Sequence, residues 1–279
     1  MALNLDIVGQ KLETEPMVYT RDDVILYALG IGAGIDDLDF IYEKNLKVYP
    51  TFAVLPFVPA VMGIFLEKCG FNLQHVLHGE HKIIMKRPIP VKGELLSTLI
   101  CDGIYDKGKT GALAAVTIET KDKDGNVLFE NKATLLDRSA GNFDGDRGPE
   151  TVKIKPPENT APDFSVTYAT TLNQAAIYRL SGDKNPLHVD PAFAKKAGFE
   201  RPILHGLCSF GHAGRAVLAC VCGNDPARLK SFSARFMNVV YPGESLTVNG
   251  WKRDDGAYIV QVENQDGKPV LGNGLAEIA

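Results

Sequence analysis

The chain repeats itself once, at a spacing near 150 residues, and this repeat limits the folds open to it. Thr20 and Tyr27 recur as Thr171 and Tyr178 at an offset of 151, and the turn at Gly93-Glu94 recurs at Gly243-Glu244. At 279 residues, each copy has about 140, which is enough for its own hydrophobic core. The sequence therefore predicts two similar units in tandem.

Each copy begins with a helix and continues into strands. Thr20 to Asp23 and Thr171 to Gln174 have the spacing of helix capping boxes, so helices are expected over 24–29 and 172–180. The β-branched runs 114–120 and 258–263 predict strands, and Asp-Gly pairs at 124 and 266 predict hairpin turns after them. Helix followed by antiparallel strands is an α+β pattern.

The two copies are joined by a polar segment without periodicity. It is rich in Gly, Pro, Asp and Asn, as linkers are. We predict an N-terminal repeat over 1–140, a linker over 141–162 and a C-terminal repeat over 163–279.

The copies differ in their second helix. Apolar residues over 207–221 recur at helical spacing and predict one long helix. The matching stretch 52–66 contains Pro56 and Pro59, which predict a short or broken helix. A disrupted helix would open space for a ligand in the first repeat.

Polar residues suited to chemistry are concentrated in the second repeat, in the run Tyr178 to His188. Asp183 and His188 are natural proton carriers, and Asn185 can hold a water or a carbonyl by hydrogen bonding. On a regular helix Asp183 and His188 would lie about 140° apart, whereas a bend at Asn185-Pro186 can bring them together. The alternatives are that Asp183 and Asn185 are turn residues and that His188 is a structural histidine.

A second motif, Pro202 to Gly206, directly precedes the long apolar helix. Free N–H groups and partial positive charge at a helix N-terminus can stabilise a developing oxyanion, and glycine lets a substrate approach the backbone. Gly206 is the candidate donor, with a plain turn residue as the alternative. His205 is interpreted as structural.

Composition and charge exclude several classes. A net charge of −4 without a basic run argues against a nucleic-acid partner. The longest apolar stretches are interrupted and predict no membrane span. His75, His78 and His81 lack supporting Cys or carboxylate ligands, so no metal site is expected.

The run Tyr178 to His188, together with Pro202 to Gly206 and Tyr241 to Glu244, resembles the (R)-specific enoyl-CoA hydratase 2, or MaoC-like, family. Segments at 77–80 and 106–108 resemble its two-repeat form, as in the hydratase part of peroxisomal multifunctional enzymes. The resemblance implies a double hot-dog fold, in which two tandem antiparallel sheets each wrap a helix.

The resemblance also implies roles for residues. Asp183 and His188 would be the acid/base pair, Asn185 would orient water, and the Gly206 N–H would be the oxyanion donor. The implied contacts to acyl-CoA are His78, Gly79, Lys107 and Phe236.

The implied reaction is reversible hydration of trans-2-enoyl-CoA to (3R)-3-hydroxyacyl-CoA in fatty-acid β-oxidation, without a metal or redox cofactor. The resemblance further implies a homodimer, fusion to dehydrogenase domains and a peroxisomal location, although the final residues are not Ser-Lys-Leu. The competing hypotheses are a hot-dog acyl-CoA thioesterase and a non-enzymatic acyl-CoA binding module.

Overall fold

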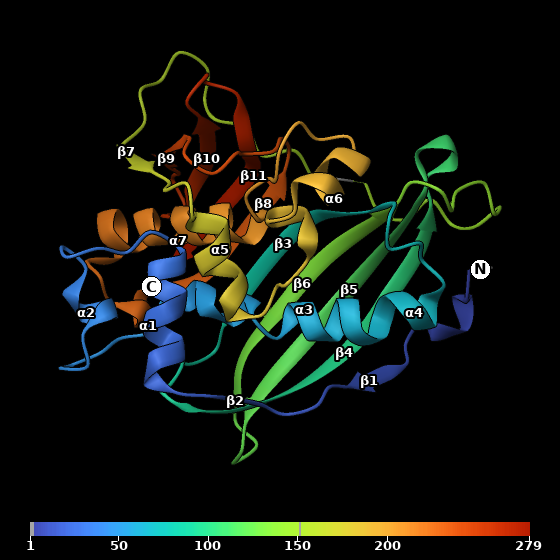
Figure 1. Ribbon diagram of the computed structural model, residues 1–279, viewed down its shortest axis with the longest axis horizontal. Coiled ribbons are helices and arrows are strands. Elements are labelled where there is room, and N and C mark those ends of the chain that lie inside the picture. Colours follow the sequence, from blue (N-terminus) through green and yellow to red (C-terminus); the bar gives the residue numbers. More distant parts are fainter. Residues whose placement is uncertain (1–2, 151) are drawn as a thin grey trace.

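The computed structural model describes residues 3–150 and 152–279, and both repeats contribute to one antiparallel sheet (Figure 1). The strand order is β1-β4-β5-β6-β3-β8-β11-β10-β9-β7, and β2 pairs with β4 beside β1. The first repeat contributes β1 (Lys11–Glu13), β2 (Met17–Tyr19), β3 (Val76–Met85), β4 (Gly93–Asp106), β5 (Ala112–Asp122) and β6 (Val127–Asp137). The second contributes β7 (Phe164–Ala169), β8 (Leu229–Phe236), β9 (Ser245–Lys252), β10 (Tyr258–Asn264) and β11 (Pro269–Ile278).

The sheet has the internal symmetry that the sequence repeat predicts. The order β4-β5-β6-β3 of the first repeat is mirrored by β9-β10-β11-β8 of the second, and the two sets meet where β3 pairs with β8. Both predicted Asp-Gly turns connect hairpin strands, and Gly125 and Gly267 have φ of 83° and 72°. The α+β prediction is confirmed.

The long helix of the second repeat is α7 (Gly206–Cys222), and it confirms the prediction for 207–221. Its buried face packs on β8, β9 and β11. It also contacts the helical run of the first repeat, where a Cβ on Gly214 would lie 2.3 Å from the Thr51 methyl carbon. Glycine therefore lets the two central helices approach closely.

The first repeat's helical run was expected to be short or broken, and that expectation is wrong in part. The chain stays helical over Pro50–Cys69, in the order 3-10 helix Pro50–Val54, α3 (Phe57–Ala60), π turn Val61–Phe65 and α4 (Leu66–Cys69). Pro50 and Pro59 lie in the first turns of 3-10 and α pieces, and Pro56 lies just before α3, so the prolines are tolerated. What they remove is regular α hydrogen bonding, which gives way to 3-10 and π geometry.

This run of 20 residues is long and apolar enough to cross a membrane, contrary to our expectation for the apolar stretches. However, 61% of its most apolar window is buried inside the protein. The run packs on β3, β4 and β6, and Asn131 of β6 donates a hydrogen bond to the Ala53 carbonyl at 2.9 Å. It is a core helix of this fold.

The helices that open the two repeats pack against each other. In α1 (Arg21–Gly30), Thr20 and Asp23 form the predicted capping box. In α5 (Gln174–Tyr178), the box is not complete, because the Thr171 hydroxyl donates to Gln174 Oε1 and the helix begins only at Gln174. The amide of Gln174 instead donates to the carbonyls of Leu29 and Gly30, which ties the two repeats together.

The segment between the repeats, from the end of β6 at residue 137 to the start of β7 at 164, has no helix or strand among its described residues. Its first part is attached to the first repeat, since the Asp106 carboxylate accepts from the Asn142 and Phe143 N–H groups. Its later part is attached to the second repeat, since Asn273 bonds the Ile154 N–H and the Val152 carbonyl. Because the sheet is continuous across β3 and β8, the boundaries at 140 and 163 stay a prediction.

Candidate active site

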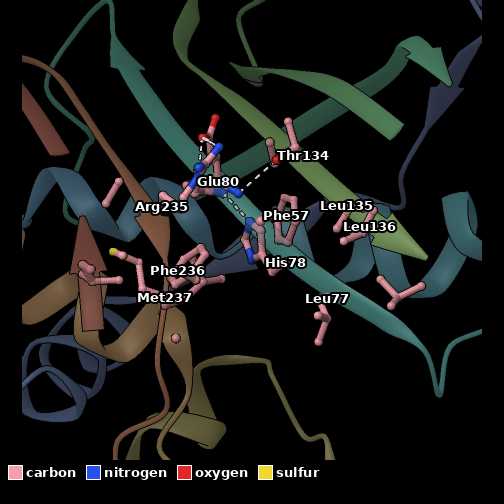
Figure 2. Close-up of a pocket in the computed structure, with 18 of the residues that line it drawn as sticks. Phe57, Leu77, His78, Glu80, Thr134, Leu135, Leu136, Arg235, Phe236 and Met237 are labelled. Atoms are coloured by element: carbon pink, nitrogen blue, oxygen red, sulfur yellow. Dashed lines mark hydrogen bonds and ion pairs between the residues drawn. The ribbon is translucent and has the colours of Figure 1, made fainter. Parts of the chain in front are cut away.

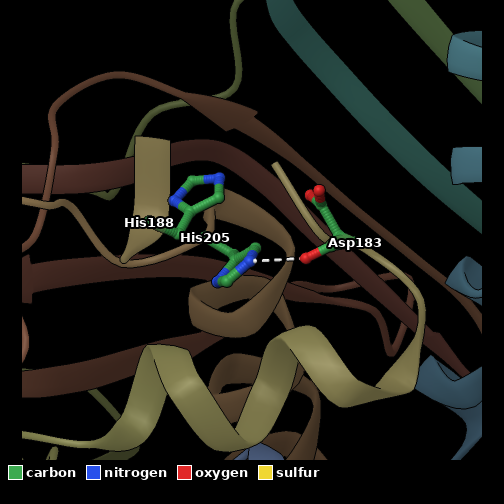
Figure 3. Close-up of side chains that lie close together, drawn as sticks. All are labelled: Asp183, His188 and His205. Carbon is green, nitrogen blue, oxygen red and sulfur yellow. Dashed lines mark hydrogen bonds between the residues drawn. The ribbon is translucent and has the colours of Figure 1, made fainter. Parts of the chain in front are cut away.

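The run Tyr178 to His188 folds as two short helical turns separated by a bend. After α5, a 3-10 turn ends at Gly182, whose φ of 134° is open to glycine and strained for other residues. Asn185, placed before a proline, is extended with ψ 124°, and a second 3-10 turn follows over Pro186–His188. One carboxylate oxygen of Asp183 and one ring nitrogen each of His188 and His205 consequently lie within 4.8 Å of one another. The loop does bring Asp183 and His188 together (Figure 3).

Asp183 and Asn185 are turn residues and also line the same cavity. Asp183 Oδ1 accepts from the Asn185 N–H at 3.2 Å, and Asn185 Oδ1 accepts from the Leu187 N–H at 3.0 Å. These bonds are the turn interactions that we weighed as the alternative to a catalytic role. They engage one oxygen of each side chain, so the second carboxylate oxygen and the amide NH₂ can face a ligand.

His188 is buried, and its hydrogen bond determines which nitrogen can act as a base. Nδ1 lies 2.8 Å from the Ile203 carbonyl, which only accepts, so Nδ1 carries the proton in the neutral ring. Nε2 is then the free lone pair. Burial lowers the pKa of His188, while the Ile203 bond and Asp183 oppose that shift. A neutral imidazole with a free Nε2 is a competent proton acceptor at neutral pH.

Gly206 is the first residue of α7 and lines the same cavity as Asp183 and His188. N–H groups in the first turn of a helix have no intrahelical acceptor, and the helix dipole adds partial positive charge there. A Cβ on Gly206 would lie 2.9 Å from Cδ1 of Phe236. Glycine thus keeps Phe236 close while leaving the backbone N–H open to a carbonyl oxygen.

A cavity of about 1000 Å³ joins these groups to the first repeat. Asp183, Asn185, His188 and Gly206 line its polar part. The apolar part is lined by residues of both repeats (Figure 2), among them Phe57, Val61, Met62, Leu77, Leu136 and Met237. The irregular helical run therefore borders the cavity, which agrees with the space expected in the first repeat.

Three of the four predicted acyl-CoA contacts line this cavity. The ring of His78 stacks on Phe57 at 4.6 Å between centroids and lies 4.6 Å from Phe236 on its other side (Figure 2). Burial lowers the pKa of His78 well below its ordinary value, so the ring is neutral. At Gly79 a Cβ would lie 2.7 Å from the Thr134 hydroxyl oxygen, which leaves no room for a side chain.

Lys107 is the exception, because it is not among the residues that line the cavity. Its ammonium group donates to the Arg147 carbonyl and lies 5.7 Å from the centroid of the Tyr105 ring. Tyr105 itself does border the cavity. Lys107 thus lies beside Tyr105, which borders the cavity, and apart from the acid/base pair.

Sequence reasoning missed the place of His205, which we interpreted as a structural residue. Its ring stacks on His188 with centroids 3.6 Å apart, and its Nε2 donates to the Asp183 carbonyl at 3.1 Å (Figure 3). The sequence signal was available, since His205 directly precedes Gly206. The sequence does not show how the chain folds between the two motifs, so it does not predict contacts between residues 15 and 22 positions apart.

The fold defines a MaoC-like enzyme on a double hot-dog scaffold. Residues 153–271 match the MaoC like domain family, and residues 17–139 match the MFE-2 hydratase 2 N-terminal domain family. The chain belongs to this MaoC-like hydratase 2 family.

Individual relatives agree with this assignment. A probable enoyl-CoA hydratase 2 of Dictyostelium discoideum is 39% identical, over 98% of this chain and 95% of its own. The crystal structure of a MaoC-like dehydratase from Phytophthora capsici superposes with a TM-score of 0.88 at 30% identity, covering 99% of this chain and 98% of its own. The structure of full-length peroxisomal multifunctional enzyme type 2 of Drosophila melanogaster superposes with a TM-score of 0.84 at 36% identity. The match covers 96% of this chain and 48% of that one.

Proposed function

We propose that this chain catalyses reversible hydration of trans-2-enoyl-CoA to (3R)-3-hydroxyacyl-CoA in fatty-acid β-oxidation. The observation behind the proposal is that Asp183, His188 and the Gly206 backbone border one cavity with an apolar branch. Relatives named enoyl-CoA hydratase 2 match nearly the whole chain, which supports the same reaction.

The proposed mechanism uses only groups of the chain and one water. The Gly206 N–H bonds the thioester oxygen, which draws electron density from C3 and stabilises the enolate as it forms. Water, held between the Asp183 carboxylate and His188 Nε2, adds its oxygen to C3 and gives up one proton to the pair. The pair returns one proton to C2, so H and OH are added with no net electron transfer.

Asn185 has a positioning role in this scheme. Its Oδ1 is held by the Leu187 N–H, and its NH₂ group can donate to the oxygen of the attacking water. Because hydration is not a redox reaction, it requires no redox cofactor. We propose that CoA enters only as part of the substrate, bound at the cavity mouth near His78 and Phe236.

Hydrolysis of the thioester is the competing reaction at such a site. A thioesterase needs water to attack C1, the carbon beside the oxyanion donor. In our scheme the paired acid and base hold the water at C3 instead, which is two bonds further along the acyl chain from C1. A binding module without activity would need neither Asp183 nor a neutral His188.

A single assay separates these functions. The purified protein is incubated with trans-2-decenoyl-CoA, and the products are resolved by chiral chromatography while free thiol is followed. We expect (3R)-3-hydroxydecanoyl-CoA without thiol release. Release of CoA thiol without the hydroxyacyl product would favour the thioesterase, the 3S product would exclude the proposed stereochemistry, and no turnover would favour a binding module.

The proposed setting follows the named relatives. An Arabidopsis thaliana relative is a peroxisomal enoyl-CoA hydratase 2, and the Drosophila relative is a larger peroxisomal multifunctional enzyme. We propose a peroxisomal location, a homodimer of this chain, and operation together with a dehydrogenase, fused or separate, that oxidises the 3-hydroxyacyl product. Light scattering of the purified chain tests the dimer, with a mass near 60.6 kDa expected from twice 30.3 kDa.

A further inference from the structure

His205 is buried against the proposed acid/base pair without bordering the cavity itself. Only 1% of the residue is exposed, and the cavity-lining residues include its neighbours Leu204 and Gly206 but not His205. A substrate in the cavity would therefore touch Asp183, His188 and Gly206, while His205 would lie behind them.

The position of His205 in the chain makes its ring orientation informative. It is the N-cap residue of α7, where Ser, Thr, Asp or Asn would stabilise the helix through a side-chain bond. The His205 side chain makes no such capping bond. Its ring is directed instead to Asp183 and His188 (Figure 3).

Two contacts connect His205 to the pair. Its Nε2 lies 3.1 Å from the Asp183 carbonyl oxygen, which only accepts, so the proton is on Nε2. Its ring lies nearly parallel to that of His188, with an interplanar angle of 26° and centroids 3.6 Å apart. One contact holds the backbone of Asp183 and the other holds the plane of the His188 ring.

The same short segment also reaches the remaining groups of the site. The Ile203 carbonyl, two residues earlier, accepts from His188 Nδ1, and Gly206, the next residue, presents the oxyanion N–H. The Leu204 N–H bonds the Val240 carbonyl at 2.7 Å, which attaches the segment to the loop between β8 and β9. Four consecutive residues thus set the relative positions of acid, base and oxyanion donor.

We propose that His205 is a positioning residue of the hydratase: its ring holds the Asp183 backbone and the His188 ring at one separation, so that both reach the same water. The inference rests on the proposed hydration reaction. His205 neither donates nor accepts a proton in that reaction, and it contacts no substrate.

The electrostatic environment agrees with a ring that stays neutral. Burial, with smaller contributions from the nearby His188 and Arg179, lowers the pKa of His205 to about 2, although its bond to Asp183 opposes this shift. Arg179 and Asp183 also act on His188, and the Tyr178 ring packs beside His205 at 4.9 Å. A neutral ring excludes water from one face of His188 and adds no charge beside it.

Two substitutions at His205 each remove one of its two contacts and keep the other. His205→Phe keeps an aromatic ring against His188 but has no N–H for the Asp183 carbonyl, whereas His205→Gln keeps an N–H donor and removes the stack. We expect each to lower kcat about 10- to 100-fold, the effect of misplaced catalytic groups, with KM changed less than about threefold. In His205→Gln the acidic limb of kcat/KM should also move to higher pH, because water reaches His188.

His212→Gln is the matched control, since it removes another buried α7 histidine that does not border the cavity. It should keep kcat within about twofold of the original chain. A second control combines each His205 substitution with His188→Ala. If His205 acts through His188, its effect on kcat should be reduced in that background. The proposal would be overturned if a His205 substitution lowered kcat as much in the His188→Ala background as in the original chain. It would also be overturned if both single His205 variants kept a kcat close to that of the original chain.

A measurement on the unaltered chain keeps the inference testable if the variants do not fold. Long-range ¹H–¹⁵N correlation spectra of the histidines should show His205 as the neutral Nε2–H tautomer throughout pH 5 to 8. A protonated His205, or the Nδ1–H tautomer, would overturn the proposal. These spectra require no turnover, so they are distinguishable from a failure of the hydratase assay, in which the unaltered chain would form no hydroxyacyl product.

Discussion

Asp183 combines a turn interaction with a proposed proton-transfer role, and the two use different atoms. Its Oδ1 accepts from the Asn185 N–H, and its backbone carbonyl accepts from His205. The turn interpretation and the catalytic interpretation of the motif are therefore compatible. Local bonds make the bend, and the bend places the carboxylate near His188.

Replacing Asp183 by Asn tests the carboxylate without removing the turn. The amide oxygen can still accept from the Asn185 N–H, but the side chain can no longer exchange a proton. We expect kcat to fall by at least ~10², the usual effect of losing a positioned acid or base. Steady-state hydration rates check this. Asp190→Asn is the control, because Asp190 is the exposed N-cap of α6 (Pro191–Lys196) and Asn caps equally well; an equal loss there would point to a general effect on folding.

The pH dependence follows from His188. Since burial lowers its pKa from the ordinary value of 6.5, the neutral form that can accept a proton persists to more acidic pH. Activity should be retained as pH falls to 6.5 and should decline only below it. The pH profile of kcat/KM checks this, and an acidic limb above pH 6.5 would contradict the buried, neutral His188.

At the scale of elements, the two central helices border different parts of the cavity. The N-terminus of α7 presents Gly206 to the cavity, whereas the run Pro50–Cys69 borders the apolar part with Phe57, Val61 and Met62. The π turn Val61–Phe65 lies in this border, and such turns widen a helix locally. The first repeat thus supplies space where the second supplies polar groups.

Narrowing this space should change the range of acyl chains. Met62 lines the cavity from the π turn, and Met62→Trp would add volume there. We expect kcat/KM to fall about tenfold or more for long trans-2-enoyl-CoA substrates and to change little for crotonyl-CoA, since one buried methylene contributes about 0.8 kcal/mol. A chain-length series checks this. Glu67→Trp, an exposed position on α4, is the control, and an equal effect in both would exclude a specific acyl contact.

For the whole molecule, the two repeats depend on each other through buried polar contacts as well as the shared sheet. Arg215 of α7 pairs with Asp37 of the first repeat at 2.9 Å, and it also donates to the Gly32 carbonyl. Both side chains are mostly buried, at 13% and 14% exposed. Removing Arg215 would leave the buried Asp37 carboxylate without its countercharge, although the Gly34 N–H and the Tyr49 hydroxyl would still donate to it.

Arg215→Met should therefore lower the free energy of unfolding by about 3 kcal/mol. Urea denaturation followed by circular dichroism measures it. Arg253→Met is the matched control, because its pair with Asp255 is exposed and such pairs contribute at most about 1 kcal/mol. Equal destabilisation by the two substitutions would contradict a structural role for the buried pair.

Much of this protein was predictable from sequence because the relevant signals are local. The offset near 150 residues predicted two repeats, the Asp-Gly pairs predicted hairpins, and the spacing over 207–221 predicted α7. The motif from Tyr178 to His188 predicted a bend that brings Asp183 to His188. Each of these depends on residues within a few positions of one another, where backbone preferences and hydrogen bonds act directly.

Only the tertiary structure decided the rest. It brought His205 under His188, placed Lys107 apart from the acid/base pair, and kept the proline-containing run of the first repeat helical. It also joined the repeats through β3 and β8 and enclosed the cavity between them. These features arise from contacts between residues 15 to 183 positions apart. Such contacts depend on how whole elements pack, which no local pattern in the sequence specifies.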